Sequence, residues 1–467
     1  MFEKIKKWHF IGIGGVGMSA IASVLNKSGF EISGSDAVES ALTRRLAADG
    51  VKIYIGHACG QIDSCDAVVL SSAIKRTNPE AIEAVERGIP ILHRSDVLAA
   101  LLNGRYGVTV AGAHGKTTTT ALLSHVAIQA GLDPTVLVGG EVDSLGGNAR
   151  YGTGQYLIAE ADESDGSFLK FFPHLSIVTN IENDHMDYYR SMDKMKAAFT
   201  QFIAQTAPKG AAVLCFDDAL LRLAAGETGC EVISYGITEE ADYQAKNISC
   251  GVGGSAYDLY FQGKFLRELK LLIPGRHNIL NSLAVIAAAR FLGIGIERIA
   301  PALASFRGVK RRFEIKGEIG GITVVDDYAH HPSEIKSTLA AAAQKKPSRL
   351  IGVFQPHRYT RTKLLKEEFG QAFALCDQLV LTDIYAAGEE PIAQINAHTL
   401  IAEINKNGRG GTVYQPNMAA VAIYLENIVQ PGDLVVTLGA GDIYKAGELL
   451  LSRLKKQWPQ SAAPEAD

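Results

Sequence analysis

The sequence predicts an α/β protein of three consecutive domains built on largely parallel sheets. Short apolar runs alternate with amphipathic stretches of helical length from end to end, which is the pattern of strands joined by crossover helices. The chain has 467 residues, enough for about three domains at ~100 to 200 residues each. The strand-like runs are, in chain order, WHFIGI, DAVVLSSA, GVTVAG, YLIAEA, LSIVTNI, GAAVLCF, LIGVFQ, QLVLTDI and DLVVTLGA.

Two breaks in this alternation predict the domain boundaries. One is the polar segment 103–105, just before the run GVTVAG. The other is the basic stretch 307–312, which follows a segment that we expect to form one long apolar helix at 279–304. The predicted domains are therefore residues 1–104, 105–309 and 310–467.

Composition excludes several classes of protein. Hydrophobic residues make up 47% and charged residues 21%, so disordered and fibrous classes are disfavoured. The net charge of −4 gives no reason to expect a nucleic-acid partner, and no stretch approaches the ~18 apolar residues that span a bilayer. The six cysteines lack metal-ligand spacing. We therefore expect a cytoplasmic protein with no membrane insertion, while the choice between monomer and homodimer stays open.

The first predicted domain begins with a strand, a glycine loop and a helix. Gly12, Gly14 and Gly17 follow GxGxxG spacing, and Asp36 lies further along. Glycines at this place let backbone N–H groups approach a diphosphate at the positive end of a helix. The motif fits an NAD-dependent dehydrogenase and equally any other nucleotide diphosphate, and a purely structural tight turn is the alternative.

The second predicted domain opens with GVTVAGAHGKTTTT, again strand, loop and helix. Lys116 would reach the β- and γ-phosphates of a nucleotide, and Thr117 would place its hydroxyl on Mg²⁺. The full consensus requires glycine where this chain has Val110, so Gly112 supplies a shorter loop. A threonine-rich helix start with a solvated lysine is the alternative. We expect Lys116 to be solvated, so that its replacement leaves the fold intact.

Polar residues also follow two later strands, where open parallel sheets bind ligands. Glu160 ends the run YLIAE, and His185 closes the segment IENDH. One carboxylate and one hydroxyl suit Mg²⁺, whereas His185 alone is at least as well explained by a structural role. Of the four acidic residues in AEADESD, at least half should be solvated or cap the loop.

Two further motifs lie towards the C-terminus. Asn278 and Asn281 are one helical turn apart and could read a base edge, or Asn278 could cap the helix. Arg358 and Arg361 could bind a carboxylate in bidentate fashion, or they could belong to a charged helix start.

Taken together, GIGGVGMSAIA, AGAHGKTTTT, AEADESDGSF, VTNIENDHMDYY, PGRHNILNSLA, GVKRRFE, DDYAHHP, FQPHRYTRT, DIYAAGEEPI and LGAGDIY closely resemble the Mur ligases. The matches cover about residues 9 to 445 in the family's order. The resemblance implies a Rossmann-like N-terminal domain, a central α/β domain of the P-loop ATPase type and a Rossmann-like α/β C-terminal domain. It implies ATP and Mg²⁺, and an ADP-forming ligation of L-alanine to the lactyl carboxylate of UDP-N-acetylmuramate, via an acyl phosphate, in peptidoglycan precursor synthesis.

The resemblance also implies roles for matching residues. Contacts to UDP-N-acetylmuramate would be Gly12, Gly14, Gly15, Gly17, Asp36, His57 and Ser71. Contacts to ATP would be Gly112, Gly115, Lys116, Thr117, Thr118, Asn281 and Asp327. The metal ligands would be Thr117, Glu160 and His185. The L-alanine subsite would hold Tyr328, His330, Arg358 and Arg361. The catalytic group would be Lys116, Arg312 and His330, with His330 as a base or a positioning residue.

One departure from the wider family concerns a second metal. Several relatives carry a carbamylated lysine where this chain has Phe199, so the ligands of any second magnesium stay open.

Among competing interpretations, a dehydrogenase leaves the second loop and the third domain unexplained. A recycling ligase that adds a ready-made peptide usually departs from GIGGVGM, and folylpolyglutamate synthetase lacks the N-terminal domain. A non-catalytic nucleotide sensor would not need Lys116, Glu160 and His185.

Overall fold

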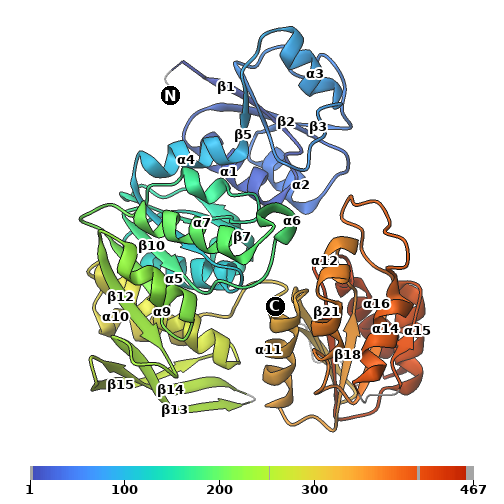
Figure 1. Cartoon of the computed structure of the whole chain (residues 1–467). Coiled ribbons are helices and arrows are strands. Elements are labelled where there is room, and N and C mark those ends of the chain that lie inside the picture. Colours follow the sequence, from blue (N-terminus) through green and yellow to red (C-terminus); the bar gives the residue numbers. More distant parts are fainter. Residues whose placement is uncertain (1–3, 252, 408–410, 459–467) are drawn as a thin grey trace. The chain divides into compact units, whose positions relative to one another are not determined.

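The computed structural model describes residues 4–251, 253–407 and 411–458, and this part of the chain forms three sheets with helices packed on them (Figure 1). The predicted α/β class is confirmed. By their internal contacts the residues divide into two compact units. The first unit is Met1–Lys246, Asp258–Leu269 and Leu280–Phe306; the second unit is Asn247–Tyr257, Lys270–Ile279 and Arg307–Asp467. The three predicted domain ranges stay predictions.

The N-terminal sheet has five parallel strands in the order β3-β2-β1-β4-β5. Its central strand β1 is buried, and Trp8, which is 0% exposed, meets Phe30 edge to face at 6.3 Å. The elements are β1 (Lys7–Ile11), α1 (Val16–Lys27), β2 (Glu31–Asp36), α2 (Ala41–Ala48), β3 (Lys52–Ile55), β4 (Ala67–Leu70), α3 (Pro79–Glu86), β5 (Ile91–His93) and α4 (Arg94–Asn103).

The central sheet has ten strands in the order β15-β14-β13-β12-β11-β10-β6-β9-β7-β8. Helix α5 packs against β6, β7, β9 and α10, which is why its threonines and alanines are buried on every side. The elements are β6 (Tyr106–Ala111), α5 (Lys116–Gln129), β7 (Thr135–Val142), η1 (Asp143–Leu145), β8 (Gly147–Arg150), β9 (Tyr156–Glu160), η2 (Ser167–Lys170), β10 (Leu175–Val178), α6 (Met186–Tyr189), α7 (Met192–Ala204), β11 (Ala211–Cys215), α8 (Ala219–Ala224), η3 (Ala225–Glu227), β12 (Glu231–Gly236), β13 (Tyr243–Gly251), β14 (Gly254–Phe261), β15 (Lys264–Leu271), α9 (Arg276–Phe291) and α10 (Ile296–Ser305).

The expected single helix at 279–304 is wrong, because the segment forms two helices, α9 and α10. Gly293 takes a left-handed conformation with φ +83°, and its N–H bonds to the carbonyl of Arg290. A glycine in this conformation ends a helix at little conformational expense. Gly295 then caps the start of α10 in an extended conformation.

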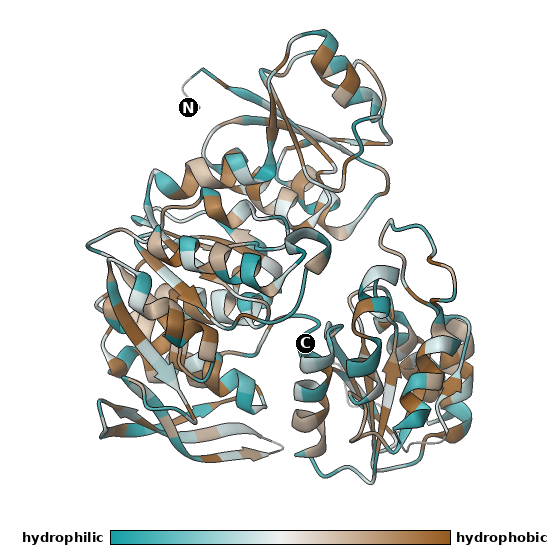
Figure 2. Ribbon diagram, viewed as in Figure 1, coloured by the Kyte–Doolittle hydropathy of each residue, from teal (hydrophilic) through white to brown (hydrophobic). Residues whose placement is uncertain are grey.

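The C-terminal sheet lies in the second unit and has the order β16-β17-β21-β18-β19-β20. Only β16 is antiparallel to its neighbour. Alternate residues of β21 belong to separate core clusters, so both faces of the sheet are covered. Figure 2 shows hydrophobic residues concentrated along its strands. Trp458, 36% exposed, follows the last helix.

The elements of this sheet are β16 (Glu314–Ile319), β17 (Ile322–Asp327), α11 (Pro332–Ala343), β18 (Arg349–Phe354), α12 (Tyr359–Leu364), α13 (Lys366–Gly370), β19 (Gln378–Leu381), α14 (Ala397–Lys406), β20 (Val413–Tyr414), α15 (Met418–Ile428), β21 (Asp433–Leu438) and α16 (Tyr444–Gln457). Across the described ranges of the whole chain, none of the helices combines the length and the apolar character needed to cross a membrane.

Candidate active site

The first glycine loop connects β1 to α1 and is fastened to the end of β2. The N–H groups of Gly12 and Ile13 both donate to the carbonyl of Ser35, at 2.8 and 2.9 Å. The N–H of Gly14 donates to Asp36 Oδ2 at 2.8 Å. A Cβ on Gly14 would lie 2.8 Å from that oxygen, so a larger residue would displace the Asp36 carboxylate. The structure thus brings Asp36 to the loop, where it organises the backbone.

The other residues predicted for the UDP-sugar lie near this loop in the chain's fold. Gly15 is the N-cap of α1 and Gly17 lies in its first turn, which has no side-chain cap and no acidic residue. Ser71 follows β4 and is half-buried. His57 Nδ1 lies 2.9 Å from Glu80 Oε1. We did not predict Glu80, because its partners are far away in the sequence.

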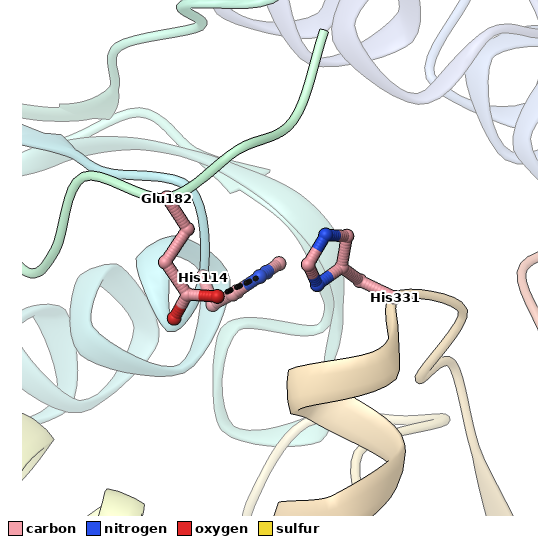
Figure 3. A group of neighbouring side chains, drawn as sticks. All are labelled: His114, Glu182 and His331. Carbon is pink, nitrogen blue, oxygen red and sulfur yellow. Dashed lines mark ion pairs between the residues drawn. The ribbon is translucent and has the colours of Figure 1, made fainter. Parts of the chain in front are cut away.

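The second glycine loop joins β6 to α5 and is held by close contacts. Gly112 has φ +131°, and a Cβ there would lie 2.1 Å from Thr179 Oγ1. Gly115, the N-cap of α5, has φ +83°, and its Cβ would lie 2.7 Å from Asn281 Oδ1. The structure therefore brings the predicted Asn281 against the loop. Between the glycines, His114 Nε2 lies 3.5 Å from Glu182 Oε2 (Figure 3).

Lys116 is not solvated as expected, because its side chain is 18% exposed and is held by three acceptors. Its ammonium donates to the carbonyl of Gly112, to that of Ala113 at 3.2 Å and to Glu163 Oε1 at 2.7 Å. Burial acts to lower the pKa of Lys116, but the carboxylate of Glu163 and its acidic neighbours raise it above its ordinary value. The lysine therefore stays charged, beside a buried carboxylate.

The predicted metal residues fall into two adjoining groups. The hydroxyl of Thr117 donates to Glu160 Oε2 at 3.2 Å, and Glu160 Oε1 accepts the N–H of Gly139. His185 Nε2 lies 3.6 Å from Glu163 Oε1. The backbone of His185 is in the left-handed region, with φ +54°. Thr118, also predicted for ATP, is buried in the first turn of α5. A hydroxyl and a carboxylate together suit Mg²⁺, which binds few protein oxygens beside phosphate.

The acidic residues at and after the end of β9 have different roles, as expected from the sequence. Asp162 Oδ1 accepts the N–H of Ser164, and Asp165 Oδ1 accepts that of Ser167, so both cap the loop. Glu163 differs, since its side chain is 1% exposed and its Oε2 has no hydrogen-bond partner among the described residues. Burial raises the pKa of Glu163 to about 7, although Lys116 opposes the shift. No local sequence signal separates Glu163 from its neighbours.

In the second unit, Asp327 is the last residue of β17, Tyr328 and His330 follow it, Arg358 and Arg361 follow β18, and Arg312 precedes β16. Both oxygens of Asp327 accept backbone N–H groups, from Phe313 at 2.9 Å and Ala329 at 2.8 Å. Burial raises the pKa of Asp327 to about 6, with Arg312 opposing. The guanidinium of Arg312 lies 5.0 Å from the ring centre of Tyr328.

His330 and the two arginines surround the same strand ends. His330 Nδ1 lies 3.0 Å from the carbonyl of Tyr328, which can only accept, so Nδ1 carries the proton. In the neutral form of the ring, Nε2 then has the lone pair. Arg361 is 9% exposed, with Nη1 3.4 Å from His357 Nδ1. Arg358, with φ +70°, begins α12.

Two aromatic residues of this region were missed by the sequence analysis. His357 stacks on Tyr385 with ring centres 5.5 Å apart and planes 8° apart.

Asn278 does not cap α9, because it lies within the helix and donates to the carbonyl of Pro274 at 2.7 Å.

Three family models match consecutive parts of the chain. They describe the Mur ligase family catalytic domain at residues 7–106, the Mur ligase middle domain at 110–289 and the Mur ligase glutamate ligase domain at 311–441. The chain belongs to the Mur ligase family, which confirms the resemblance and excludes a dehydrogenase.

Within the family the similar proteins include UDP-N-acetylmuramate--L-alanine ligases. The UDP-N-acetylmuramate--L-alanine ligase of Pelotomaculum thermopropionicum is 49% identical, over 97% of this chain and 99% of that protein. The crystal structure of UDP-N-acetylmuramate-alanine ligase MurC from Thermotoga maritima superposes with TM-score 0.82 at 30% identity, over 97% of this chain and 99% of that one. MurF ligase from Thermotoga maritima, solved in complex with ADP, shares the fold with TM-score 0.64 at 18% identity, over 91% of this chain and 95% of that one.

Proposed function

We propose that this chain joins L-alanine to the lactyl carboxylate of UDP-N-acetylmuramate, with conversion of ATP to ADP and phosphate, in the cytoplasmic synthesis of peptidoglycan precursors. One observation carries the proposal: two glycine loops, each at the N-terminus of a helix, lie in a single compact unit. Each suits a diphosphate or triphosphate, and the second adds Lys116 and Thr117. The names of the similar proteins supply the sugar and the amino acid.

We assign ATP to the loop of Gly112 and Gly115 and Mg²⁺ to Thr117 and Glu160, with His185 beside them. Bound ATP supplies the phosphoryl group, and Mg²⁺ offsets part of its charge. The buried ammonium of Lys116 is already charged, so it can attract phosphate oxygens without taking up a proton. Asn281 and Thr118 would contact the nucleotide beside the loop. Asp327 would contact the ribose through its carboxylate oxygens, each of which can accept a further hydrogen bond beside the one from a backbone N–H.

The reaction has two steps with no covalent enzyme intermediate. A carboxylate oxygen of the muramate takes the γ-phosphoryl group, ADP leaves, and an acyl phosphate forms. The alanine nitrogen then attacks the carbonyl carbon, the C–O bond to phosphate breaks, and the amine proton passes to a base. Positioning and electrostatics must therefore provide the catalysis.

We assign His330 as the base that accepts the amine proton. The carbonyl of Tyr328 accepts a hydrogen bond from its Nδ1–H, so that Nε2 is the nitrogen that can take up a proton. Arg358 and Arg361 would hold the alanine carboxylate, and Tyr328 would limit the room for its side chain. Arg312 would offset charge at the transferring phosphoryl group.

The test is phosphate release with ATP, Mg²⁺, UDP-N-acetylmuramate and L-alanine, each omitted in turn. Release should require all four. A clear preference for a ready-made tripeptide over L-alanine would assign the chain to peptide recycling, and release without the UDP-sugar would refute the proposal.

A further inference from the structure

A buried carboxylate, Glu80, lies at the centre of a hydrogen-bonded cluster in the N-terminal sheet. Its Oε2 accepts from His9 Nε2 and from the hydroxyl of Ser35, both at 2.7 Å. Its Oε1 lies 2.9 Å from His57 Nδ1. The side chains of His9 and Glu80 are 0% exposed, while that of His57 is 21% exposed. His57 is therefore the member of this cluster that can meet a ligand.

Glu80 is held in place and kept ionised by its surroundings. Asn78 caps α3 by accepting the N–H of Glu80, and Pro79 occupies the first helical position. The carboxylate thus lies in the first turn, where the positive end of the helix favours it. Burial acts to raise the pKa of Glu80, but the hydrogen bonds from its three partners lower it below its ordinary value.

The hydrogen bonds to Glu80 determine which ring nitrogen of His57 carries the proton. An ionised carboxylate can only accept hydrogen bonds. His9 Nε2, the Ser35 hydroxyl and His57 Nδ1 must therefore each supply a proton to Glu80. With Nδ1–H directed at Glu80, Nε2 is the remaining nitrogen of His57, and in the neutral ring it is an acceptor.

The same cluster is joined to the first glycine loop through Ser35. The hydroxyl of Ser35 contacts Glu80 and lies 3.1 Å from His57 Nδ1. Its carbonyl accepts the N–H groups of Gly12 and Ile13. A single residue of β2 therefore fastens both the loop and the imidazole. Ionised groups buried in a core are often replaceable by apolar residues without loss of stability, so stability alone does not explain the cluster.

We propose that Glu80 is a positioning residue of the UDP-sugar site. It holds His57 with Nδ1 protonated, so that Nε2 accepts a hydrogen bond from a hydroxyl or imide N–H of the ligand. Through Ser35 it holds the glycine loop beside that nitrogen. This inference rests on the proposed function, because the ligand is the UDP-sugar.

The first test reads the tautomer in the full-length protein. ¹⁵N NMR at a pH where imidazole is neutral should show His57 Nδ1 protonated and Nε2 unprotonated, with the His57→Gln variant used to assign the signals. Glu80→Gln should move the proton towards Nε2, because the amide NH₂ can face Nδ1. An unprotonated Nδ1 in the wild type would overturn the proposal, and this result does not depend on any variant of Glu80 folding.

The second test measures binding of UDP-N-acetylmuramate by calorimetry. Glu80→Gln should weaken binding about tenfold to a hundredfold, since it removes a hydrogen bond to a charged group, and should leave ATP binding unchanged. Glu86→Gln, exposed on the same helix, is the matched control. Combined with His57→Ala, Glu80→Gln should add less loss than it causes alone, because only its effect on the glycine loop through Ser35 remains. An equal added loss would mean that Glu80 does not act through His57, and would overturn the proposal.

Wild-type behaviour separates the two proposals. A wild type that neither binds UDP-N-acetylmuramate nor ligates L-alanine would refute the proposed function. A wild type that does both, together with undiminished binding by Glu80→Gln, would refute the role of Glu80 alone.

Discussion

Lys116 and Glu163 form a pair in which neither charge can be removed without consequence for the other. Glu163 is 1% exposed, and Lys116 is the cation that compensates it at 2.7 Å. Removing one partner of a buried pair leaves an uncompensated charge, which destabilises the fold strongly. A single substitution of Lys116 would therefore mix loss of stability with loss of catalysis.

The cleaner prediction compares Glu163→Gln with the double variant Lys116→Ala/Glu163→Gln. The double variant should lose a further ~10² to 10³ in kcat, the usual effect of removing one electrostatic group from a transition state. Phosphate release gives kcat and thermal unfolding reports stability, with the exposed Lys194→Ala as control. If the two variants turned over equally, Lys116 would not serve ATP.

His277 should make stability depend on pH. Burial lowers the pKa of His277 to about 4, with Glu334 opposing the shift. The unfolded chain, with a pKa of about 6.5, then binds more protons than the folded chain between those values. The free energy of unfolding should consequently fall as pH drops from about 6.5 to about 4, by at most about 3 kcal/mol, because the half-buried ring is partly screened.

We therefore predict that the Tm of the wild type falls more between pH 7 and pH 5 than that of His277→Gln. The exposed His398→Gln should follow the wild type. Calorimetric scans at several pH values measure the difference. Parallel Tm curves for wild type and His277→Gln would show that His277 is protonated in the folded state as readily as in the unfolded one.

At the scale of elements, helix α5 has a left-handed glycine at each end, and the two differ in one respect. Gly115 has φ +83° and Gly131 has φ +78°. A Cβ on Gly115 would meet Asn281, whereas a Cβ on Gly131 would meet nothing within 4 Å. Substitutions at these two glycines therefore separate the effect of backbone strain from that of crowding the second glycine loop.

We predict that Gly115→Ala and Gly131→Ala each lose about 1 to 2 kcal/mol of stability, the usual penalty for a left-handed alanine. Only Gly115→Ala should lose ATP affinity, since only there must Asn281 and the loop move apart. Titration with ATP and thermal unfolding measure the two effects. Equal loss of ATP affinity in both variants would mean that the loop responds to helix stability alone.

The elements also show what the sequence could predict. Apolar runs predicted the parallel strands, and the spacing within Gly112–Thr117 predicted the glycine loop between β6 and α5, because both signals are local. The break at Gly293 was missed since apolar residues continue across it. The contact between His9 and Glu80 joins residues 71 positions apart. Such partners become neighbours only through the strand order, which sequence pattern does not supply.

At the scale of the whole molecule, the residues proposed for the UDP-sugar and those proposed for L-alanine belong to different units. The glycine loops belong to the first unit, and Arg358, Arg361 and His330 belong to the second. Substitutions at one subsite should therefore affect the affinity for one substrate.

Arg358→Ala should accordingly raise the KM for L-alanine about tenfold to a hundredfold, the worth of a hydrogen bond to a charged group. The KM values for ATP and UDP-N-acetylmuramate should stay nearly constant. Steady-state kinetics with each substrate varied give the three values, and Lys363→Ala, exposed on the same helix, is the control. A defect confined to ATP would show that Arg358 has been assigned to the wrong substrate.

The two tryptophans of the sequence give each unit its own fluorophore. Trp8 is 0% exposed in β1, the strand that leads into the first glycine loop, and Trp458 is 36% exposed at the end of α16. An indole shielded from water emits at shorter wavelength than a hydrated one, so Trp8 should emit at shorter wavelength than Trp458. Substituting Trp458 by phenylalanine would leave a chain whose tryptophan fluorescence follows the N-terminal sheet alone, substituting Trp8 instead would leave the signal of the second unit, and the unfolding of each unit could then be recorded separately.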